Sequence, residues 1–197
     1  MHFTFLTRCY TPVNLNAIKQ NIKDVFKDTE HTYTHLILVD LTHDDQRGQS
    51  FDGYEDDVTL VKFVENKPEG DTQNVKGMDN ALAELPDDGY IYILDDDNLL
   101  HKDFPQVAQY CNGEDAVVFR VDHMLTWGDP QLLKGNPIGR IDWANYVTKL
   151  KTMKDLKVYP GGHRCEDGMF FHRMMQHNCI FKFIDKVFAY YNKLPRR

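Results

Sequence analysis

The sequence predicts a three-layer α/β/α fold with a mostly parallel central sheet. Short β-rich runs alternate with stretches of helical periodicity as far as Val121, which is the pattern of repeated strand–helix–strand units. Charged residues follow several of these runs directly, as Arg8, Asp40 and Asp95 do. Because the carboxyl ends of parallel strands meet at one edge of the sheet, we expect these positions to line a ligand crevice.

The first half of the chain contains the clearest strand and helix patterns. Tyr90–Leu94 is apolar throughout, so we expect it at the buried centre of the sheet. Thr11-Pro12 opens the first helical stretch, and proline is favoured at a helix start. The predicted strands are Phe3–Arg8, Tyr33–Val39, Val58–Val64, Tyr90–Leu94 and Asp115–Val121. The predicted helices are the stretch that Thr11-Pro12 opens, in which Leu15, Ile18, Ile22, Val25 and Phe26 fall at helical spacing, and the ranges Thr72–Leu85 and Asp103–Cys111.

The second half is less regular. His123–Arg140 has many glycines and prolines and little periodicity, and a loop of this length inside a domain is usually functional. A helix is predicted over Asp142–Lys151, and a glycine-rich turn leads Glu166 and Asp167 into another helix. That helix is predicted over Met169–Gln176, and two short strands over Ile180–Phe183 and Val187–Tyr191.

Length and composition favour one domain over residues 1–197 and exclude some partners. The net charge of −7 argues against nucleic acid or an anionic membrane as the main partner. No stretch approaches the ~20 apolar residues of a membrane span, so we expect no stable membrane insertion. The four cysteines are scattered without metal-site spacing, which predicts reduced thiols in a cytoplasmic protein. A homo-oligomer stays open.

The most informative motif is the acidic run Asp95-Asp96-Asp97-Asn98 at the end of the Tyr90–Leu94 strand. Adjacent buried carboxylates repel one another, so they need a cation. Along an extended backbone, Asp95 and Asp97 point to the same side and offer oxygens to one hard cation, Mg²⁺ or Mn²⁺. The alternative is a solvated acidic turn that caps the following helix through Asn98 or Asp103.

The order of these pieces resembles the GT-A glycosyltransferases, most closely the family 2-like group. Four segments carry the resemblance, which covers nearly the whole chain in order and spacing. They are Thr7-Arg8-Cys9-Tyr10-Thr11-Pro12 after the first strand; the strand ending at Asp40; Gly77 with Asn80-Ala81-Leu82; and the two acidic motifs, Asp95–Asn98 and Cys165-Glu166-Asp167-Gly168.

Two departures from the family pattern matter. Asn98 stands where the acidic motif usually has its last acid. The stretch after Asp167 is short, so we expect the acceptor-binding elements of longer members to be missing or supplied by a partner.

The resemblance implies a GT-A fold, Rossmann-like, with a nucleotide-binding part over 1–100 and an acceptor-side part over 101–197. It implies a nucleotide-diphosphate sugar donor, UDP-sugar favoured, and Mn²⁺ or Mg²⁺ as cofactor. The implied metal ligands are Asp95 and Asp97. His163, next to the acidic pair, is a further candidate from its chemistry, since a neutral imidazole can complete a metal's coordination or contact a phosphate. The implied donor-site and sugar-stacking residues are Thr7, Arg8, Asp40, Asp96 and Trp127. For Asp40 the alternative is a turn residue, and for Arg8 an ordinary surface position.

Transfer to a hydroxyl of a glycan or another acceptor requires a base. By resemblance Asp167 is that base, Glu166 is the runner-up, and the reaction inverts the anomeric centre. The alternative for both acids is stabilisation of the helix N-terminus.

Three other functions compete with this prediction. A nucleotidyltransferase would favour a glycine-rich loop bearing Lys or Arg after the first strand, where this chain has Arg8-Cys9-Tyr10-Thr11-Pro12. A catalytically silent carbohydrate- or nucleotide-binding module is favoured by Asn98. A metal-dependent phosphoesterase would need several regularly spaced His and Asp ligands, which the sequence does not show.

Overall fold

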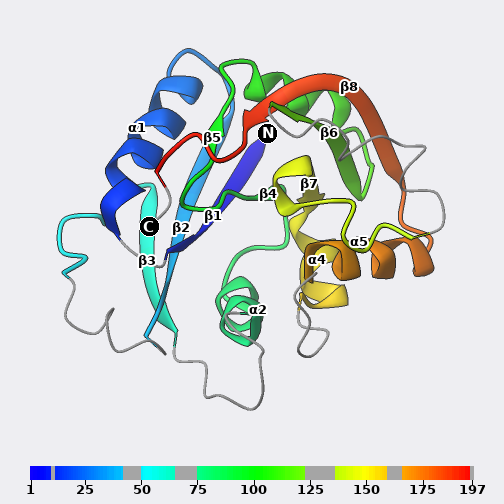
Figure 1. Ribbon diagram of the computed structural model, residues 1–197, viewed down its shortest axis with the longest axis horizontal. Helices are drawn as coiled ribbons and strands as arrows, with labels where there is room; N and C mark the ends of the chain where they lie inside the picture. The colour runs from blue at the N-terminus through cyan, green and yellow to red at the C-terminus, as the bar shows by residue number, and fades with distance from the viewer. Residues whose placement is uncertain (10–11, 42–49, 65–74, 123–135, 159–165, 196–197) are drawn as a thin grey trace.

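A computed structural model describes residues 1–9, 12–41, 50–64, 75–122, 136–158 and 166–195 (Figure 1). The side chains of Asp40, Val75 and Lys76 are outside this description. Within the described ranges the chain forms a single mixed sheet with helices on both faces.

The sheet has the strand order β3-β2-β1-β4-β7-β6-β8-β5. Parallel pairs join β1 to β2, β2 to β3, β1 to β4 and β6 to β8. Only β7 and β5 run against their described neighbours. The strands are β1 (His2–Cys9), β2 (Thr32–Asp40), β3 (Thr59–Val64), β4 (Tyr90–Ile93), β5 (Leu99–Leu100), β6 (Ala116–Asp122), β7 (Tyr146–Lys149) and β8 (Phe181–Tyr190). This confirms the predicted α/β class and mostly parallel sheet.

Two helical layers cover the two faces of the sheet. One layer holds α1 (Leu15–Phe26) and the 3₁₀ helix η2 (Phe104–Tyr110); the other holds α2 (Val75–Ala83), α4 (Leu150–Leu156) and α5 (Glu166–Gln176). Short 3₁₀ helices precede α1 and β7, as η1 (Pro12–Asn14) and η3 (Trp143–Asn145).

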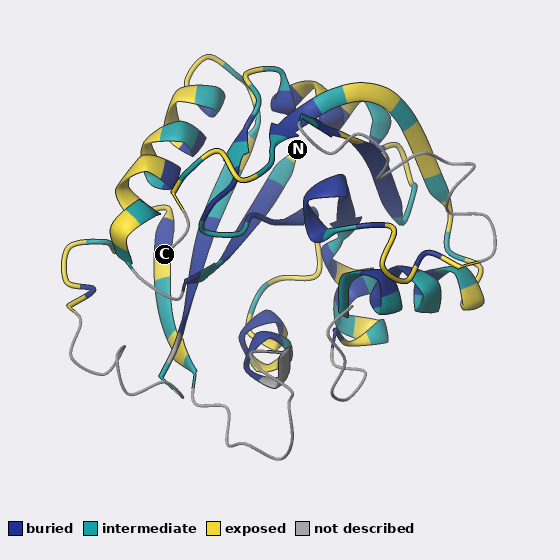
Figure 2. Ribbon diagram, viewed as in Figure 1, coloured by how far each residue is buried: buried dark blue, intermediate teal, exposed yellow. Residues whose placement is uncertain are grey.

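Strand β4 shows why the centre of the sheet is buried on both sides. All four of its residues are buried. Tyr90 and Tyr92 pack in the cluster of α1 and η2, whereas Ile91 and Ile93 pack with the helices of the other layer. The continuous apolar run is therefore a central strand, and Figure 2 shows the sheet centre in dark blue.

Two predicted elements differ from the structure. The helix predicted over Asp142–Lys151 is wrong: most of that range is η3 and β7, and the helix α4 begins only at Leu150. The β-forming side chains of Tyr146–Lys149 pair with β4 and β6 on either side, so tertiary pairing overrides the helical spacing. The two short strands predicted near the end are one strand, β8, with register shifts around Arg120 of β6.

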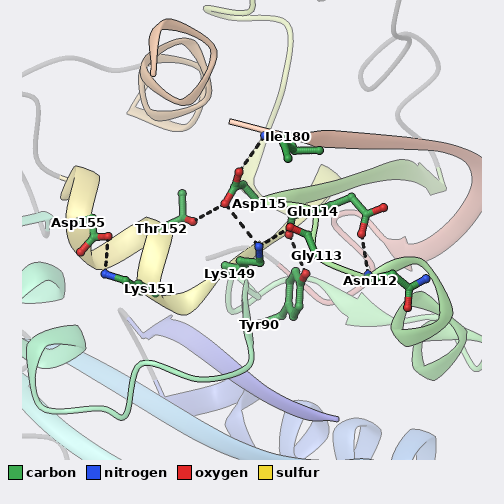
Figure 3. A network of polar contacts seen from close by, with 10 residues as sticks. All are labelled: Tyr90, Asn112, Gly113, Glu114, Asp115, Lys149, Lys151, Thr152, Asp155 and Ile180. Carbon is green, nitrogen blue, oxygen red and sulfur yellow. Dashed lines mark hydrogen bonds and ion pairs between the residues drawn. The ribbon is translucent and has the colours of Figure 1, made fainter. Parts of the chain in front are cut away.

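A polar network ties the strands together at the amino end of β4 (Figure 3). The Asp115 carboxylate accepts the Thr152 hydroxyl at 3.0 Å and the Ile180 N–H at 2.8 Å, and Lys149 Nζ lies 3.7 Å from it. The Tyr90 hydroxyl donates to the Glu114 carbonyl at 2.7 Å. These contacts join β4, β6, β7, α4 and the start of β8, so the network has a structural role.

Two further predictions concern membranes and cysteines. No described helix is long and apolar enough to cross a membrane. Cys9, Cys111 and Cys179 carry free thiols, in line with the predicted reduced state, and Cys165 lies outside the described residues.

Candidate active site

Arg8 and Asp95 meet at the carboxyl ends of the neighbouring parallel strands β1 and β4. Arg8 donates to one carboxylate oxygen, Oδ1, from Nε at 2.9 Å and from Nη2 at 2.7 Å. Both side chains are partly buried, at 18% and 22% exposed. Among the described residues the other oxygen, Oδ2, has no hydrogen-bond partner, so Asp95 keeps one oxygen for a further ligand.

The acidic run is a turn and not a continuation of the strand. β4 ends at Ile93, and the Asn98 N–H donates to the Asp95 carbonyl at 3.0 Å, which closes the turn. The strand alternation that predicts Asp95 and Asp97 on one side therefore does not apply, because a turn does not alternate its side chains. Asp97 is buried, with 7% exposed, and Asn98 is fully buried.

Glu166 and Asp167 lie in the first turn of α5, which begins at Glu166, three residues before the predicted start at Met169. Gly168 lets this turn approach closely, because an added Cβ there would lie 2.7 Å from the Ile138 Cα. The Tyr146 hydroxyl donates to the Asp167 carbonyl at 3.3 Å. The tight packing of Gly168 and the bond from β7 fix the acidic pair relative to the sheet.

Asp142 is a fourth acid of the site and was not predicted. It caps η3: its Oδ1 accepts the Ala144 N–H at 2.9 Å, and Asn145 Oδ1 accepts the Asp142 N–H at 3.1 Å. Since β7 runs antiparallel to β4, the residues just before β7 come to lie at the end of β4 that leads into Asp95. The negative charges of Asp95 and Asp167 both act on Asp142.

Three acids of the site, Asp142, Glu166 and Asp167, hold protons more tightly than ordinary carboxyls. Burial, together with the negative charge of Asp95, raises the pKa of Asp142 to about 7. Burial raises the pKa of Glu166 to about 7, and the Arg8 guanidinium opposes that shift. Burial likewise raises the pKa of Asp167 to about 6, while the Gly168 N–H, bound at 2.7 Å, and Arg8 lower it. Carboxyls that titrate near neutrality are suited to proton transfer.

Within the described ranges, the cation that acts on all these acids is Arg8. It lowers the pKa of Glu166, Asp167 and Asp142, and it is paired to Asp95. Among the described residues, one guanidinium faces four carboxylates, so this part of the site has a negative field into which a cation or a bound proton fits.

The described residues alone do not form a complete metal cage. No three His, Cys, Asp or Glu side chains among them are arranged to hold a metal ion, and His163 lies outside them. Mg²⁺ is usually bound by one or two carboxylates plus substrate phosphates and water, so the spare oxygen of Asp95 beside the buried Asp97 fits such a hard cation.

The structure places the other predicted residues in different surroundings. Thr7 is fully buried, and its hydroxyl is hydrogen bonded to His35 Nε2 of β2 at 2.9 Å. No described contact supports a nucleotide role for it. The Asp96 carbonyl accepts from Asn14 Nδ2 at 2.8 Å. Asp40 ends β2 beside Val64, but its side chain lies outside the described residues, as do Trp127 and His163.

Two residues of the site, Asp142 and Tyr146, are absent from the sequence prediction. Their local signal is the capping pattern Asp142-x-x-Asn145, which marks the start of a helical turn. The capping pattern does not show that the next residues form a strand between β4 and β6. That pairing alone brings both side chains to the acids.

Comparison with solved structures identifies the fold. The mannosyltransferase PcManGT from Pyrobaculum calidifontis, in complex with GDP-Man and Mn²⁺, matches 99% of this chain and 57% of its own, at 13% identity and a TM-score of 0.66. S. aureus TarS 1-349 in complex with UDP matches over 97% of this chain and 60% of its own, at 18% identity and a TM-score of 0.64.

A third structure is similar over its whole length. HddC from Yersinia pseudotuberculosis, complexed with GMP-PN, matches over 98% of this chain and 94% of its own, at 11% identity and a TM-score of 0.58. This chain spans about 60% of the TarS 1-349 chain. No protein-family model matches the sequence, and no curated protein matches it.

The chain therefore has the fold of the GT-A glycosyltransferases, as the sequence resemblance implied. In this fold class the carboxyl ends of the parallel strands form the ligand crevice, and Arg8, Asp95, Asp142 and Asp167 gather there.

Proposed function

We propose that this protein is a metal-dependent glycosyltransferase that moves a sugar from a nucleotide-diphosphate donor to a hydroxyl acceptor with inversion. The observation that carries the proposal is the group of raised-pKa acids around Arg8 at the carboxyl edge of a GT-A sheet. We favour UDP as the donor nucleotide. A nucleotide-sugar donor is supported by PcManGT, which has the same fold and is complexed with GDP-Man.

The donor diphosphate would bind beside Arg8 and the acidic turn. Asp95 and Asp97 would hold Mn²⁺ or Mg²⁺, directly or through water, and when bound the cation supplies Lewis-acid stabilisation of the departing diphosphate. Arg8, whose guanidinium lies at the carboxyl end of β1 against Asp95, would contact the diphosphate. Asp40, at the end of β2, would contact the base.

Asp167 would act as the base. Its carboxylate takes the proton of the acceptor hydroxyl while the acceptor oxygen bonds to the anomeric carbon and the bond to the diphosphate oxygen breaks. Attack opposite the leaving group inverts the anomeric centre. Glu166 precedes it on the same helical turn, and its pKa of about 7 makes it the second candidate.

A nucleotidyltransferase is the second candidate function. It is favoured by HddC, which is complexed with GMP-PN and is matched over 94% of its own chain, whereas TarS 1-349 in complex with UDP is matched over 60%. The two reactions differ in product: transfer of a sugar releases a nucleoside diphosphate, whereas formation of a nucleotide sugar from a nucleoside triphosphate and a sugar phosphate releases pyrophosphate.

A thermal-shift screen tests the proposal. UDP, GDP, CMP, dTDP and ATP are each added with Mn²⁺, Mg²⁺ or EDTA, because a ligand that binds only the native state stabilises it by about 2.7 kcal/mol at a hundred times its Kd. We expect metal-dependent stabilisation by one nucleoside diphosphate. No stabilisation by any nucleotide would contradict the proposal and favour a silent binding module, and stabilisation by ATP alone would favour the nucleotidyltransferase.

Asp97→Ala and the isosteric Asp97→Asn should abolish the metal-dependent part of this shift, because each removes a ligand charge. Asp155→Ala is the matched control, since it removes a carboxylate that is 59% exposed and paired with Lys151 on α4. Metal-dependent shifts that are equal in all three variants would overturn the role of the acidic turn.

A further inference from the structure

Asn14 at the N-cap of α1 and Asn21 within the helix contact the two ends of the acidic turn. Asn14 Nδ2 donates to the Asp96 carbonyl at 2.8 Å. Seven residues on, Asn21 bonds both backbone groups of Leu100: its Oδ1 accepts the Leu100 N–H at 2.7 Å and its Nδ2 donates to the Leu100 carbonyl at 3.2 Å. Residues seven apart share one face of a helix, so a single face of α1 holds both ends of the 95–100 segment.

Helix stability does not explain either asparagine. Asn14 occupies the N-cap position of α1, where asparagine is favoured for its capping oxygen, yet its side chain makes no capping bond. Its amide instead bridges the Asp96 carbonyl and the Pro195 carbonyl, the latter at 3.1 Å. Asn21 lies in the helix interior, where asparagine is a weak helix former. Both side chains instead form hydrogen bonds with the backbone of the 95–100 segment.

The segment after β8 holds the turn from the other side. The Leu194 N–H donates to the Asp97 carbonyl at 2.9 Å, and the Asn192 N–H donates to Asn98 Oδ1 at 2.8 Å. In Figure 1 this segment, drawn in red, leaves β8 and passes beside α1. Asn98 is fully buried, so the amide at the position of the family's last acid is part of the support of the turn.

All of these donors are neutral, and most of them bind backbone carbonyls. A lysine or arginine in place of Asn14 would pair with the carboxylates and compete with a cation for them. An amide or a backbone N–H fixes the path of the turn and leaves its carboxylates charged. This arrangement suits a turn whose side chains have a ligand to bind.

We infer that Asn14, Asn21 and Asn98 are positioning residues, which hold the acidic turn in the conformation that binds the metal ion of the donor complex. The inference rests on the proposed function. It assigns a role to the asparagine that departs from the family pattern, and it makes the 191–195 segment part of the site.

Variants of Asn14 test the inference, with Asn16 as the matched position. Asn16 is an exposed asparagine of α1 and has no contact with the turn among the described residues. The four variants are Asn14→Ala, Asn14→Asp, Asn16→Ala and Asn16→Asp, and the probe is Mn²⁺ titrated in the presence of UDP, or of the nucleoside diphosphate that the screen selects. Thermal unfolding without ligand confirms that each variant folds.

We expect Asn14→Ala to weaken the apparent Mn²⁺ affinity about tenfold, the lower end of the effect of removing a group that orients metal ligands. Asn14→Asp should weaken it further, because its carboxylate would face two carbonyl oxygens. Both Asn16 variants should bind as the wild type does. Wild-type affinity in Asn14→Ala would overturn the inference.

Amide hydrogen exchange separates this inference from the proposed function. In the ligand-free protein, the amides of Asn98, Leu100 and Leu194 should exchange faster in Asn14→Ala and Asn21→Ala than in Asn16→Ala. Unchanged exchange would overturn the inference even if the wild type binds a metal–nucleotide complex. If the wild type binds none, the proposed function fails, and faster exchange would then show a purely structural support, which also overturns the positioning role.

Discussion

Asp115 and Asp167 lie at opposite ends of the same strands and differ in what meets their carboxylates. Asp115, at the amino end of β4, is met by donors from α4 and from the start of β8, with Lys149 nearby (Figure 3). Asp167, at the carboxyl end, receives the Gly168 N–H and shares the charge of Arg8 with three other acids. The first carboxylate joins elements together, and the second keeps capacity for a proton.

The comparison shows that an acid is assigned by its partners and not by its residue type. Asp115 directly precedes β6 and Asp167 lies in the first turn of α5, and both are acidic residues beside the same sheet. A carboxylate whose oxygens are all bound by protein donors has nothing left for a ligand. One buried beside like charges has its pKa raised towards neutrality, and such groups concentrate at functional sites.

Among the variants that distinguish the two ends of the strands, Asp167→Asn should have the largest effect. It should lower the rate of sugar transfer by roughly a hundredfold or more and leave donor binding intact, because an amide cannot take the acceptor proton. Turnover and donor affinity are measured on the same preparation. A variant with near-wild-type turnover would return Asp167 to a helix-terminus role, and Glu166→Gln would then be tested in its place.

Asp142→Asn tests the raised pKa at the carboxyl end through the pH dependence of the free energy of unfolding. In the folded protein the pKa of Asp142 is raised from 3.8 to about 7, so the folded state keeps a proton that the unfolded state loses. The stability linked to that proton is fully present below about pH 4 and is lost as the pH rises towards 7. Asparagine carries no charge and keeps the capping bond to Ala144, so the variant should match the wild type at pH 4 and exceed it at pH 8.

The expected gain in the free energy of unfolding at pH 8 is on the order of 2 kcal/mol. One unit of pKa is worth about 1.4 kcal/mol, and only part of the raised pKa is assigned to Asp142 itself because its charge interacts with those of Asp95 and Asp167. Urea unfolding in EDTA at both pH values measures it. Asp155→Asn, an exposed acid on α4, controls for the loss of charge alone. An equal difference at pH 4 and pH 8 would argue against a raised pKa at Asp142.

Asp115→Asn should have the smallest effect, and it should change the stability of the fold and not the turnover. The Thr152 hydroxyl can rotate to accept from the new amide, and the remaining oxygen can still accept the Ile180 N–H, so chiefly the attraction of Lys149 is lost. We expect a loss of about 0.5–1 kcal/mol in the free energy of unfolding and unchanged turnover. Reduced turnover with unchanged stability would break the distinction between the two ends.

The sequence predicts the fold better than it predicts the geometry of the site. The runs around Phe3–Arg8 and Tyr90–Leu94 form strands as expected, because local periodicity and burial agree there. The short strand β7 was missed, since its pairing with β4 and β6 is long-range and the local spacing is helical. Asp142 reaches the site only through that pairing.

The acidic turn shows the same limit at smaller scale. The residue types of Asp95–Asp97 predict a cation partner, and the structure supplies Arg8, which the sequence places eighty-seven residues away. The turn itself is closed by Asn98 and held by Asn14 and Leu194, contacts between distant segments that no local pattern encodes. Residue chemistry was therefore predictable, and side-chain direction was not.

Paramagnetic broadening by Mn²⁺ tests the central claim most directly. Amide NMR spectra are recorded with UDP, or the nucleoside diphosphate that the screen selects, and either Mn²⁺ or diamagnetic Mg²⁺. We expect Mn²⁺ to broaden the amide signals of the Asp95–Asn98 turn and of Gly168, while those of Asp115 and Ile180 stay sharp at the other end of the sheet. Broadening centred on Asp115, or equal at both ends, would contradict the account.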